Sequence, residues 1–460
     1  MKKQILFFVM MLLPMVTSAD DAVKVGDIWY NLIPKGKVAS VTSSPNGVKY
    51  SGSVVIPPSF NYNNVDYNVT GIGSYAFYEC SGLTSVTIPN CVKSIGESAF
   101  HNCTGLTSVT LPNSVTSMGK HAFDSCIGLT SFVIPNGVTS IEDMTFSSCT
   151  GLTSVTIPNS VTSIKLFAFV GCTGLTSVNI PNSVVSIGEY AFGVCTGLTS
   201  LTIPNSVTSL GNRVFERCTG LTSLTIGSGV REISENAFYY CTSLTSVTIP
   251  NSVTSIELSA FAECSSLLSV TIGSGIERIY DNAFGYCPEL TDVYCWAAKV
   301  PEMRKRNGEY GGTDAFQGSL IEYVTLHVPS TSIDSYKEVE PWKSFGEIVA
   351  LDGTTPPQQN KCATPTIVKA GSKLKFECAT PGATISTRLT ANIEPQEKTG
   401  SEMVLETGSI TYTLTVVATA EGYEASDPAT MDITIERGDV NCDGNVNSAD
   451  IQKIYGIMAE

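Results

Sequence analysis

A period of 23 residues organises most of this chain. Cysteine, phenylalanine and leucine each recur ten times at this interval, with no insertion or deletion between Cys80 and Cys287. Residues 149–171 form a representative unit, CTGLTSVTIPNSVTSIKLFAFVG. A strict period of this length is typical of a solenoid, in which each unit buries its apolar edge only against its neighbours. The repeated cysteines are Cys80, Cys103, Cys126, Cys149, Cys172, Cys195, Cys218, Cys241, Cys264 and Cys287.

The apolar spacing inside a unit predicts how the chain coils. Leu83, Val86 and Ile88 have polar residues between them, which is the alternation of a short strand. Pro89 and Asn90 then end the strand, and the chain returns through three apolar anchors. Those anchors are Val92, Ile95 and Phe100. We therefore expect a mainly β solenoid of about ten rungs, on the order of 50 Å long at ~4.8 Å per rung.

The motifs of the unit also carry a family resemblance. The segment LTSVTI supplies the LxxLxL core of a leucine-rich repeat, and the AF-x-x-C tail with the 23-residue period resembles the BspA-like class of bacterial surface proteins. The resemblance implies a leucine-rich repeat solenoid at residues 67–295, between an N-terminal cap at 20–66 and a C-terminal rung and cap at 296–352. It also implies attachment to host matrix proteins and to other bacteria.

The cysteine ladder has two interpretations. Stacked rungs bring successive Cα atoms to about 5 Å, which permits a disulfide. Each cysteine also lies beside the phenylalanine and leucine ladders, where a free cysteine behaves as a small apolar residue. Disulfides between alternate rungs would impose a two-rung period, and no other position of the repeat shows one. We therefore expect buried free thiols.

Threonines form a second regular feature, at two positions of the predicted strand. Threonine favours strands and forms stabilising cross-strand pairs, so structure alone accounts for the pattern. The functional alternative is a flat, almost uncharged adhesive surface, and here we expect ligand binding at Thr153, Thr176, Thr199 and Thr222. Departures from the pattern are candidates for specificity. They are Val133, Asn179, Leu268 and Tyr294.

Charge and composition exclude several functions. The chain has 42 acidic and 27 basic residues, a net charge of −15 and a pI near 4.7, which argues against a nucleic-acid partner. Its three histidines, His101, His121 and His327, lie far apart in the sequence and offer few candidates for metal or triad chemistry. Carboxylates in the repeats are scattered and vary between units. We therefore do not expect an enzyme.

The first 19 residues predict export. Lys2 and Lys3 precede an apolar segment at residues 5–16, and small residues at 17–19 suit a signal peptidase. No later apolar run is long enough to span a membrane. We expect a protein that is secreted, either extracellular or on the cell surface, and that has no membrane span after cleavage.

The period ends before a polar, proline-containing linker at residues 353–361. Residues 362–436 contain β-branched runs separated by Gly, Pro and Asn, which predict a small antiparallel β-sandwich. This stretch resembles the immunoglobulin-like modules of exported bacterial proteins. A disulfide between Cys362 and Cys378 is possible, and the sequence leaves the redox state of this pair open.

Residues 437–460 carry a calcium-binding pattern. The oxygen ligands are spaced as in a calcium loop, with Gly444 at the sharp turn. The predicted ligands of one calcium ion are Asp439, Asn441, Asp443, Asn445, Asn447 and Asp450. The segment resembles one half of a type I dockerin. Because dockerins bind cohesin domains through two such halves, a cohesin-like partner is an open expectation.

These features favour an adhesion protein whose solenoid binds extracellular matrix or other bacterial surface macromolecules. The alternative is a non-catalytic subunit of an extracellular polysaccharide-degrading assembly, docked through the dockerin-like tail. A free-standing hydrolase would need convergent acids or a nucleophile–base pair. The carboxylates Glu97, Glu189 and Glu257 occupy positions that differ between units and do not predict such a site.

Overall fold

The computed structural model describes residues 22–305 and 314–351, together with seven strands between residues 360 and 435. The chain divides into two compact units, Met1–Gly353 and Thr354–Glu460. The predicted signal peptide, residues 1–19, lies outside the described residues. In the part of the chain that the structure describes, no helix is long and apolar enough to cross a membrane.

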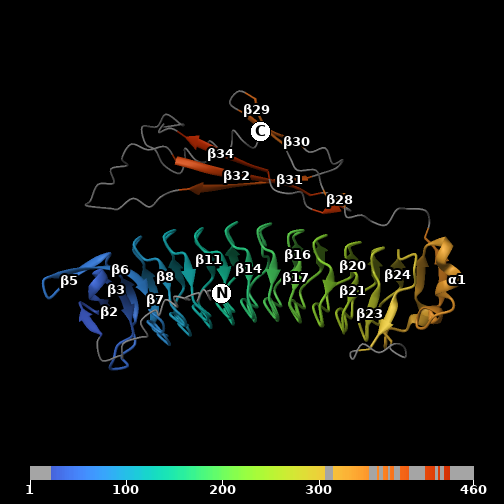
Figure 1. The fold of residues 1–460 in the computed structure, drawn as a ribbon, viewed down its shortest axis with the longest axis horizontal. Coiled ribbons are helices and arrows are strands. Elements are labelled where there is room, and N and C mark those ends of the chain that lie inside the picture. Colours follow the sequence, from blue (N-terminus) through green and yellow to red (C-terminus); the bar gives the residue numbers. More distant parts are fainter. Residues whose placement is uncertain are drawn as a thin grey trace, which may run out of the picture. The chain divides into compact units, whose positions relative to one another are not determined.

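The first unit is a mainly β solenoid of stacked rungs (Figure 1). The predicted strand forms in nearly every rung, and neighbouring rungs pair in parallel with a shift of 23 residues, as in Ser131 with Ser154 and Ser200 with Ser223. The predicted fold class is therefore confirmed. These first strands are β7 (Leu83–Thr87), β9 (Ser108–Thr110), β11 (Ser131–Val133), β13 (Ser154–Thr156), β16 (Ser200–Ile203), β18 (Ser223–Ile226), β20 (Ser246–Ile249), β22 (Ser269–Ile272) and β24 (Asp292–Cys295).

Each rung also contains a second, shorter strand on its return segment. Ser163 and Ile164 pair in parallel with Ser140 and Ile141 of the preceding rung. The sequence predicts only apolar anchors here, because two residues are too few to show an alternation. The second strands are β8 (Ser94–Ile95), β10 (Ser117–Met118), β12 (Ser140–Ile141), β14 (Ser163–Ile164), β15 (Ser186–Ile187), β17 (Ser209–Leu210), β19 (Glu232–Ile233), β21 (Ser255–Ile256), β23 (Arg278–Tyr280) and β25 (Glu302–Arg304).

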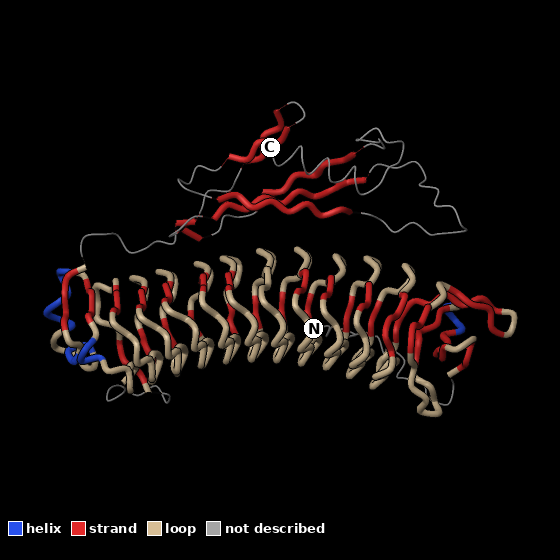
Figure 2. The backbone as a smooth tube through the Cα atoms, turned by 180° about the vertical axis from the view of Figure 1, so that it is seen from behind, coloured by secondary structure: helices blue, strands red, loops and turns tan. Residues whose placement is uncertain are grey.

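Between the second strand and the next cysteine, each rung passes through turns, seen as a row of loops along one long edge of the stack (Figure 2). The backbone of these turns still bonds from rung to rung. The amide of Phe167 donates to the carbonyl of Glu189 at 2.9 Å, and Phe169 to Ala191 at 2.7 Å. Backbone hydrogen bonds between rungs therefore form at the first strand, at the second strand and at the turns, which satisfies the backbone polar groups there.

The core of the solenoid consists of ladders of identical residues. Successive phenylalanine rings from Phe77 to Phe284 stack with centroids 4.9–5.7 Å apart and planes within 11° of parallel. The repeated cysteines and leucines are equally buried. Each ring packs between two others in the offset arrangement that aromatic pairs prefer, so the Phe ladder stabilises every rung interface.

Both ends of the solenoid are covered. At the start, β1 (Val23–Val25), β2 (Ile28–Ile33) and β3 (Val38–Thr42) form an antiparallel meander, and β3 pairs with β6 (Val65–Ile72). β5 (Ser59–Tyr62) pairs with β6, and β4 (Gly52–Val55) pairs with β7. At the other end, β26 (Thr325–Val328) and β27 (Glu347–Ala350) extend the first-strand sheet, and α1 (Ile333–Tyr336) lies between them. The fully buried Tyr336 and Trp342 close this end of the core.

The second unit is also β. β31 (Thr384–Asn392), β32 (Ile410–Thr419) and β34 (Ala429–Ile435) form an antiparallel sheet, and β29 (Thr366–Ala370) pairs with β30 (Lys373–Glu377) in the same sense. β28 (Asn360–Lys361), at the end of the predicted linker, pairs in parallel with β33 (Tyr423–Glu424). Cys362, Cys378 and the predicted calcium loop at 439–450 lie outside the described residues.

Candidate ligand-binding faces of the solenoid

The first strands present one long face, which we call the strand face. It consists of the solvent-facing residues one, two and four positions after each repeated leucine. From Thr84 to Thr291 these positions carry no charged residue, and most of them are Thr or Ser. All four predicted ligand-binding threonines lie on this face with exposed side chains. The structure therefore places the threonine ladder on a surface that a large ligand can reach.

The threonine hydroxyls are used within the ladder. Thr153 Oγ1 donates to the carbonyl of Thr130 at 3.0 Å, and Thr222 Oγ1 donates to Thr199 at 3.0 Å. Thr199 makes the same bond to Thr176 at 3.3 Å. At these three threonines the hydroxyl hydrogen therefore supports the stack, while the oxygen lone pairs and the methyl groups remain available to a ligand.

Departures from the threonine pattern alter the strand face at separate places. Val133 and Leu268 expose 65% and 46% of their surface, which adds isolated apolar groups. Asn179 is also exposed. Tyr294 stacks on His327 with centroids 4.2 Å apart, so the ladder ends in an aromatic pair instead of threonines.

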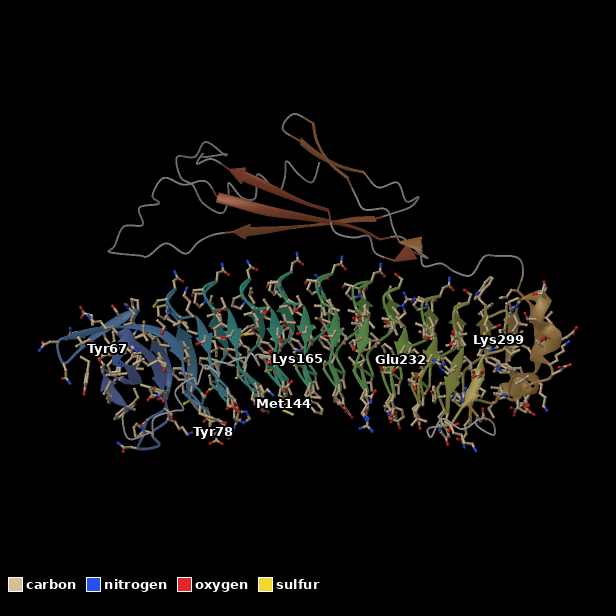
Figure 3. All side chains as sticks on the ribbon, in the orientation of Figure 1. Tyr67, Tyr78, Met144, Lys165, Glu232 and Lys299 are labelled. Atoms are coloured by element: carbon tan, nitrogen blue, oxygen red, sulfur yellow. The ribbon has the colours of Figure 1, made fainter. Side chains whose placement is uncertain are left out.

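The turns form a second long face, which we call the turn face. Tyr78 and Met144, three rungs apart, lie along the same edge of the stack (Figure 3). Two positions in every rung have a positive φ, and residues of many types occupy them. The first position holds Tyr75, Ser98, His121, Met144, Phe167, Tyr190, Arg213, Asn236, Ser259 and Asn282. The second holds Glu79, Asn102, Ser125, Ser148, Gly171, Val194, Arg217, Tyr240, Glu263 and Tyr286.

Large side chains gather in the middle of the turn face. Phe167 stacks on Tyr190 at 5.3 Å, Arg213 lies over the Tyr190 ring at 5.8 Å, and Arg217 lies over Tyr240 at 5.3 Å. We call these five residues the aromatic–arginine patch. Contacts of this kind hold exposed rings and guanidinium groups in fixed positions.

A buried carboxylate lies under the aromatic–arginine patch. Glu216 is 8% exposed, and its oxygens lie 3.6 Å from the Nε atoms of both Arg213 and Arg217. Burial raises the pKa of Tyr190, and its hydrogen bond with Glu216 raises it further. The patch is therefore ordered before any ligand arrives, which lowers the entropic cost of binding. Tyr and Arg are also the residues that dominate binding energy at protein interfaces.

The sequence contains a signal for this patch that the threonine pattern does not reveal. Phe167, Tyr190 and Arg213 are 23 residues apart, and so are Arg217 and Tyr240. Equal positions in successive rungs lie directly beside one another. The histidines are far apart in the sequence, but two of them meet in space for the same reason: His101 and His121 are separated by almost one period, and their ring centroids are 6.4 Å apart.

A small cavity of about 160 Å³ opens at the N-terminal end of the turn face. Tyr50, Tyr75 and Tyr78 line it together with Lys49, whose ammonium lies 5.3 Å from the centre of the Tyr78 ring. None of the residues that line it is acidic. The volume is below the several hundred Å³ of a typical small-molecule site.

The cysteine ladder is buried and free of disulfides in the structure. From the second rung on, each thiol lies 2.9–3.4 Å from the carbonyl oxygen of the phenylalanine 26 residues earlier and donates to it. Burial raises the thiol pKa to about 12 at Cys103, Cys172, Cys218 and Cys287. Thiols in this state are poor nucleophiles, so the ladder is a structural element.

Comparison with known proteins shows which repeats those of this chain are similar to. Residues 70–198 and 162–291 match the model of the BspA type leucine rich repeat region, in six copies. No curated protein is significantly similar to the chain.

Several crystal structures are similar to parts of the chain. A leucine rich cell surface protein from Faecalibacterium prausnitzii A2-165 is 28% identical over 60% of this chain and 94% of its own, with a TM-score of 0.35. A leucine-rich repeat protein from Bacteroides ovatus ATCC 8483 is also 28% identical, over 72% of this chain and 100% of its own, with a TM-score of 0.39. The pneumococcal vaccine antigen PcpA is 18% identical over 74% of this chain and 100% of its own, with a TM-score of 0.45.

The family match coincides with the stacked rungs, the LxxLxL strands and the buried Phe and Cys ladders of the first unit. The repeats at residues 70–291 are therefore similar to leucine-rich repeats of the BspA type.

Proposed function

We propose that this protein is a non-catalytic adhesion protein, secreted or displayed on the bacterial surface, whose solenoid binds extracellular matrix or other bacterial surface macromolecules. One observation carries the proposal: the solenoid presents an exposed face that consists mostly of Thr and Ser and has no charged residue from Thr84 to Thr291. Such a face offers many weak, repeated contacts, which suit an extended protein or glycan better than a small molecule.

The strand face is the proposed area of contact, with Thr153, Thr176, Thr199 and Thr222 at its centre. Since this face has almost no charge, screening by salt should remove little of the affinity. The aromatic–arginine patch is the alternative area for the same function, because it supplies ordered Tyr and Arg side chains.

A comparison of two variant sets tests the proposal. The full chain is applied to immobilised extracellular-matrix proteins and to fixed bacterial cells, and retention is measured by surface plasmon resonance and by cell-binding counts. We expect Lys substitutions at Thr153, Thr176 and Thr199 to reduce retention at least tenfold. Changes at Lys165 and Glu189, on the return segments, should have little effect.

The outcome separates the two faces. If the threonine variants bind like the wild type and alanine at Tyr190, Arg213 and Tyr240 removes retention, the turn face is the contact area. If the wild-type chain is retained by no matrix protein and no cell, the adhesion proposal is wrong.

We further propose that the loop from Asp439 to Asp450 binds one calcium ion, on the strength of its ligand spacing. Calorimetric titration of the full chain with Ca²⁺ should show a binding event that the Asp439→Ala, Asp443→Ala double variant lacks. Identical isotherms would remove the site. Docking onto a cohesin-like domain, and with it membership of a polysaccharide-degrading assembly, rests on the same loop. A cohesin panel bound only by the wild-type chain would support this second function.

A further inference from the structure

Three side chains converge on the turn face near the N-terminal end of the solenoid. Asp124 Oδ2 lies 3.0 Å from His121 Nδ1 and 3.3 Å from His101 Nδ1. One ligand atom from each of the three residues lies within 4.8 Å of the other two. Two of the three histidines of the whole chain thus share one carboxylate oxygen.

The repeat itself brings these residues together. His101 and Asp124 occupy the same position of successive rungs, 23 residues apart, and His121 lies three residues before Asp124 on the same turn. Backbone bonds fix both turns, since the amide of Asn102 donates to the carbonyl of Asp124 at 2.7 Å and the amide of Asp124 donates to His121 at 3.2 Å. The cluster is therefore held in place by backbone hydrogen bonds within and between the rungs.

Neighbouring side chains orient the cluster. Ser125 Oγ donates to Asp124 Oδ1 at 3.0 Å, which leaves Oδ2 to face the imidazoles. Tyr78 stacks on the His101 ring with centroids 5.0 Å apart and planes 9° from parallel. Asp124 is 8% exposed, while the two histidine side chains expose 26% and 33%. Supporting contacts of this kind are typical of residues that bind metal ions.

The electrostatics of the cluster call for protons or a metal ion between its ligand atoms. A carboxylate oxygen and an unprotonated imidazole nitrogen each present a lone pair, and three such atoms repel one another unless protons or a metal ion lie between them. His101 Nδ1 is buried and makes no hydrogen bond to any of the described residues. A buried polar atom without a hydrogen bond is costly, and a bound ion removes that cost by accepting its lone pair.

We propose that His101, His121 and Asp124 bind a divalent transition metal ion of the Zn²⁺ class. With metal–ligand bonds of roughly 2.0–2.1 Å, a tetrahedral site places its ligand atoms about 3.3 Å apart, close to the separations at Asp124 Oδ2. Two nitrogen donors favour Zn²⁺ and its neighbours over Ca²⁺ or Mg²⁺. This site is distinct from the calcium loop and does not depend on the adhesion proposal.

The site leaves part of the metal coordination open. Three protein ligands occupy three positions, and the partly exposed histidines border solvent. The remaining position accepts water or a carboxylate or imidazole of a bound macromolecule, as is common when a protein supplies three ligands.

Zinc titration of the full chain tests the proposal. Calorimetry is performed with excess Ca²⁺, so that the tail loop is occupied, and Co²⁺ absorption reports the donor atoms. We expect one Zn²⁺ per chain, and at least a tenfold loss of affinity in His101→Phe and in Asp124→Asn. Phe at position 101 keeps an aromatic ring against Tyr78 and removes only the ligand nitrogen, and circular dichroism verifies that both variants fold.

His327→Phe is the matched control. His327 Nε2 lies 2.9 Å from Asp292 Oδ1 and its ring stacks on Tyr294, so it resembles half of the cluster but has no second histidine beside it. Zinc affinity should be unchanged in this variant. The proposal is overturned if His101→Phe and Asp124→Asn bind zinc like the wild type, if His327→Phe alone removes binding, or if Co²⁺ shows thiolate charge-transfer bands.

Discussion

The strand face and the turn face are made by the same rungs, yet one repeats its residues and the other varies them. One position after the repeated leucine, eight consecutive rungs carry Thr, from Thr84 to Thr245. At the first positive-φ position of the turn, ten rungs carry seven residue types. On the strand face, side chains bond from rung to rung, so a change in one rung disturbs its neighbour. On the turn face, the hydrogen bonds that recur in every rung are made by the backbone. The side chains form ring contacts and ion pairs only at some rungs and are free to differ.

The difference between the two faces suggests that they have different roles. Repeated positions stabilise the stack. The variable positions of neighbouring rungs together form groups of side chains that no single repeat contains, such as the aromatic–arginine patch and the His101–His121–Asp124 cluster.

The largest effect should come from alkaline pH acting on the cysteine ladder. An unfolded thiol has a pKa near 9, and burial raises the native values to about 12 at four rungs. Above pH 9 the native state therefore holds more protons than the unfolded state, and stability falls as pH rises. Each thiol contributes about 1.4 kcal/mol per pH unit, so ten thiols should cost on the order of 10 kcal/mol by pH 10.

Circular dichroism against pH measures this loss, which should fall between pH 9 and 10. Serine at Cys195, Cys218 and Cys241 keeps the hydrogen bond to the phenylalanine carbonyl and does not ionise in this range. The triple variant should therefore unfold at a higher pH. A wild-type chain that stays folded past pH 10.5, with no thiols titratable in denaturant, would show that the ladder is oxidised.

Truncation of one ring in the core should have the next largest effect. Phe192 is fully buried and stacks on Phe169 at 5.1 Å and on Phe215 at 5.5 Å. Phe192→Ala should lower the free energy of unfolding by about 3–5 kcal/mol. Tyr240→Ala, on the turn face, removes a ring that is 39% exposed and should cost less than about 1 kcal/mol. Urea unfolding of both variants measures the contrast, and equal losses would contradict the division between the two regions.

The sequence predicts the repeated strands and core well and the variable turn face poorly. Apolar spacing and the repeat period predict burial directly. They therefore predict the strand and the core from residues such as Leu83, Val86 and Phe77. The positive-φ turns give no such signal, since Tyr, Phe and Arg occupy positions where Gly is the usual residue. His101 and His121 look distant until their numbers are compared with the period of 23.

A smaller effect should follow loss of a hydroxyl on the strand face. Thr222 Oγ1 donates to the carbonyl of Thr199 at 3.0 Å, so Thr222→Val should destabilise the solenoid by about 0.5–1.5 kcal/mol. Thr202 lies on the same face, but in the described structure its hydroxyl makes no side-chain hydrogen bond, and Thr202→Val is the matched control. Thermal melts of the two variants should differ. Identical melting temperatures would mean that the ladder hydroxyls add nothing to the stability of the stack.

The smallest effect should come from exchanging residues at the second positive-φ position of the turn. Ser148 has a φ of 55° and an exposed side chain, and Gly171 has the same place in the next rung with a φ of 72°. Left-handed backbone costs a non-glycine residue roughly 1–2 kcal/mol, partly offset by the entropy that Gly loses on folding. Ser148→Gly should therefore stabilise the chain by about 0.5–1 kcal/mol. Gly171→Ser should destabilise it by a similar amount, because an added Cβ meets nothing closer than 3.7 Å and the backbone strain acts alone. Chemical unfolding of each single variant and of the double variant, in which the two changes should nearly cancel, measures both signs. A stabilising Gly171→Ser would show that the turn backbone is not strained, and the variety of residues on the turn face would then carry no cost to stability.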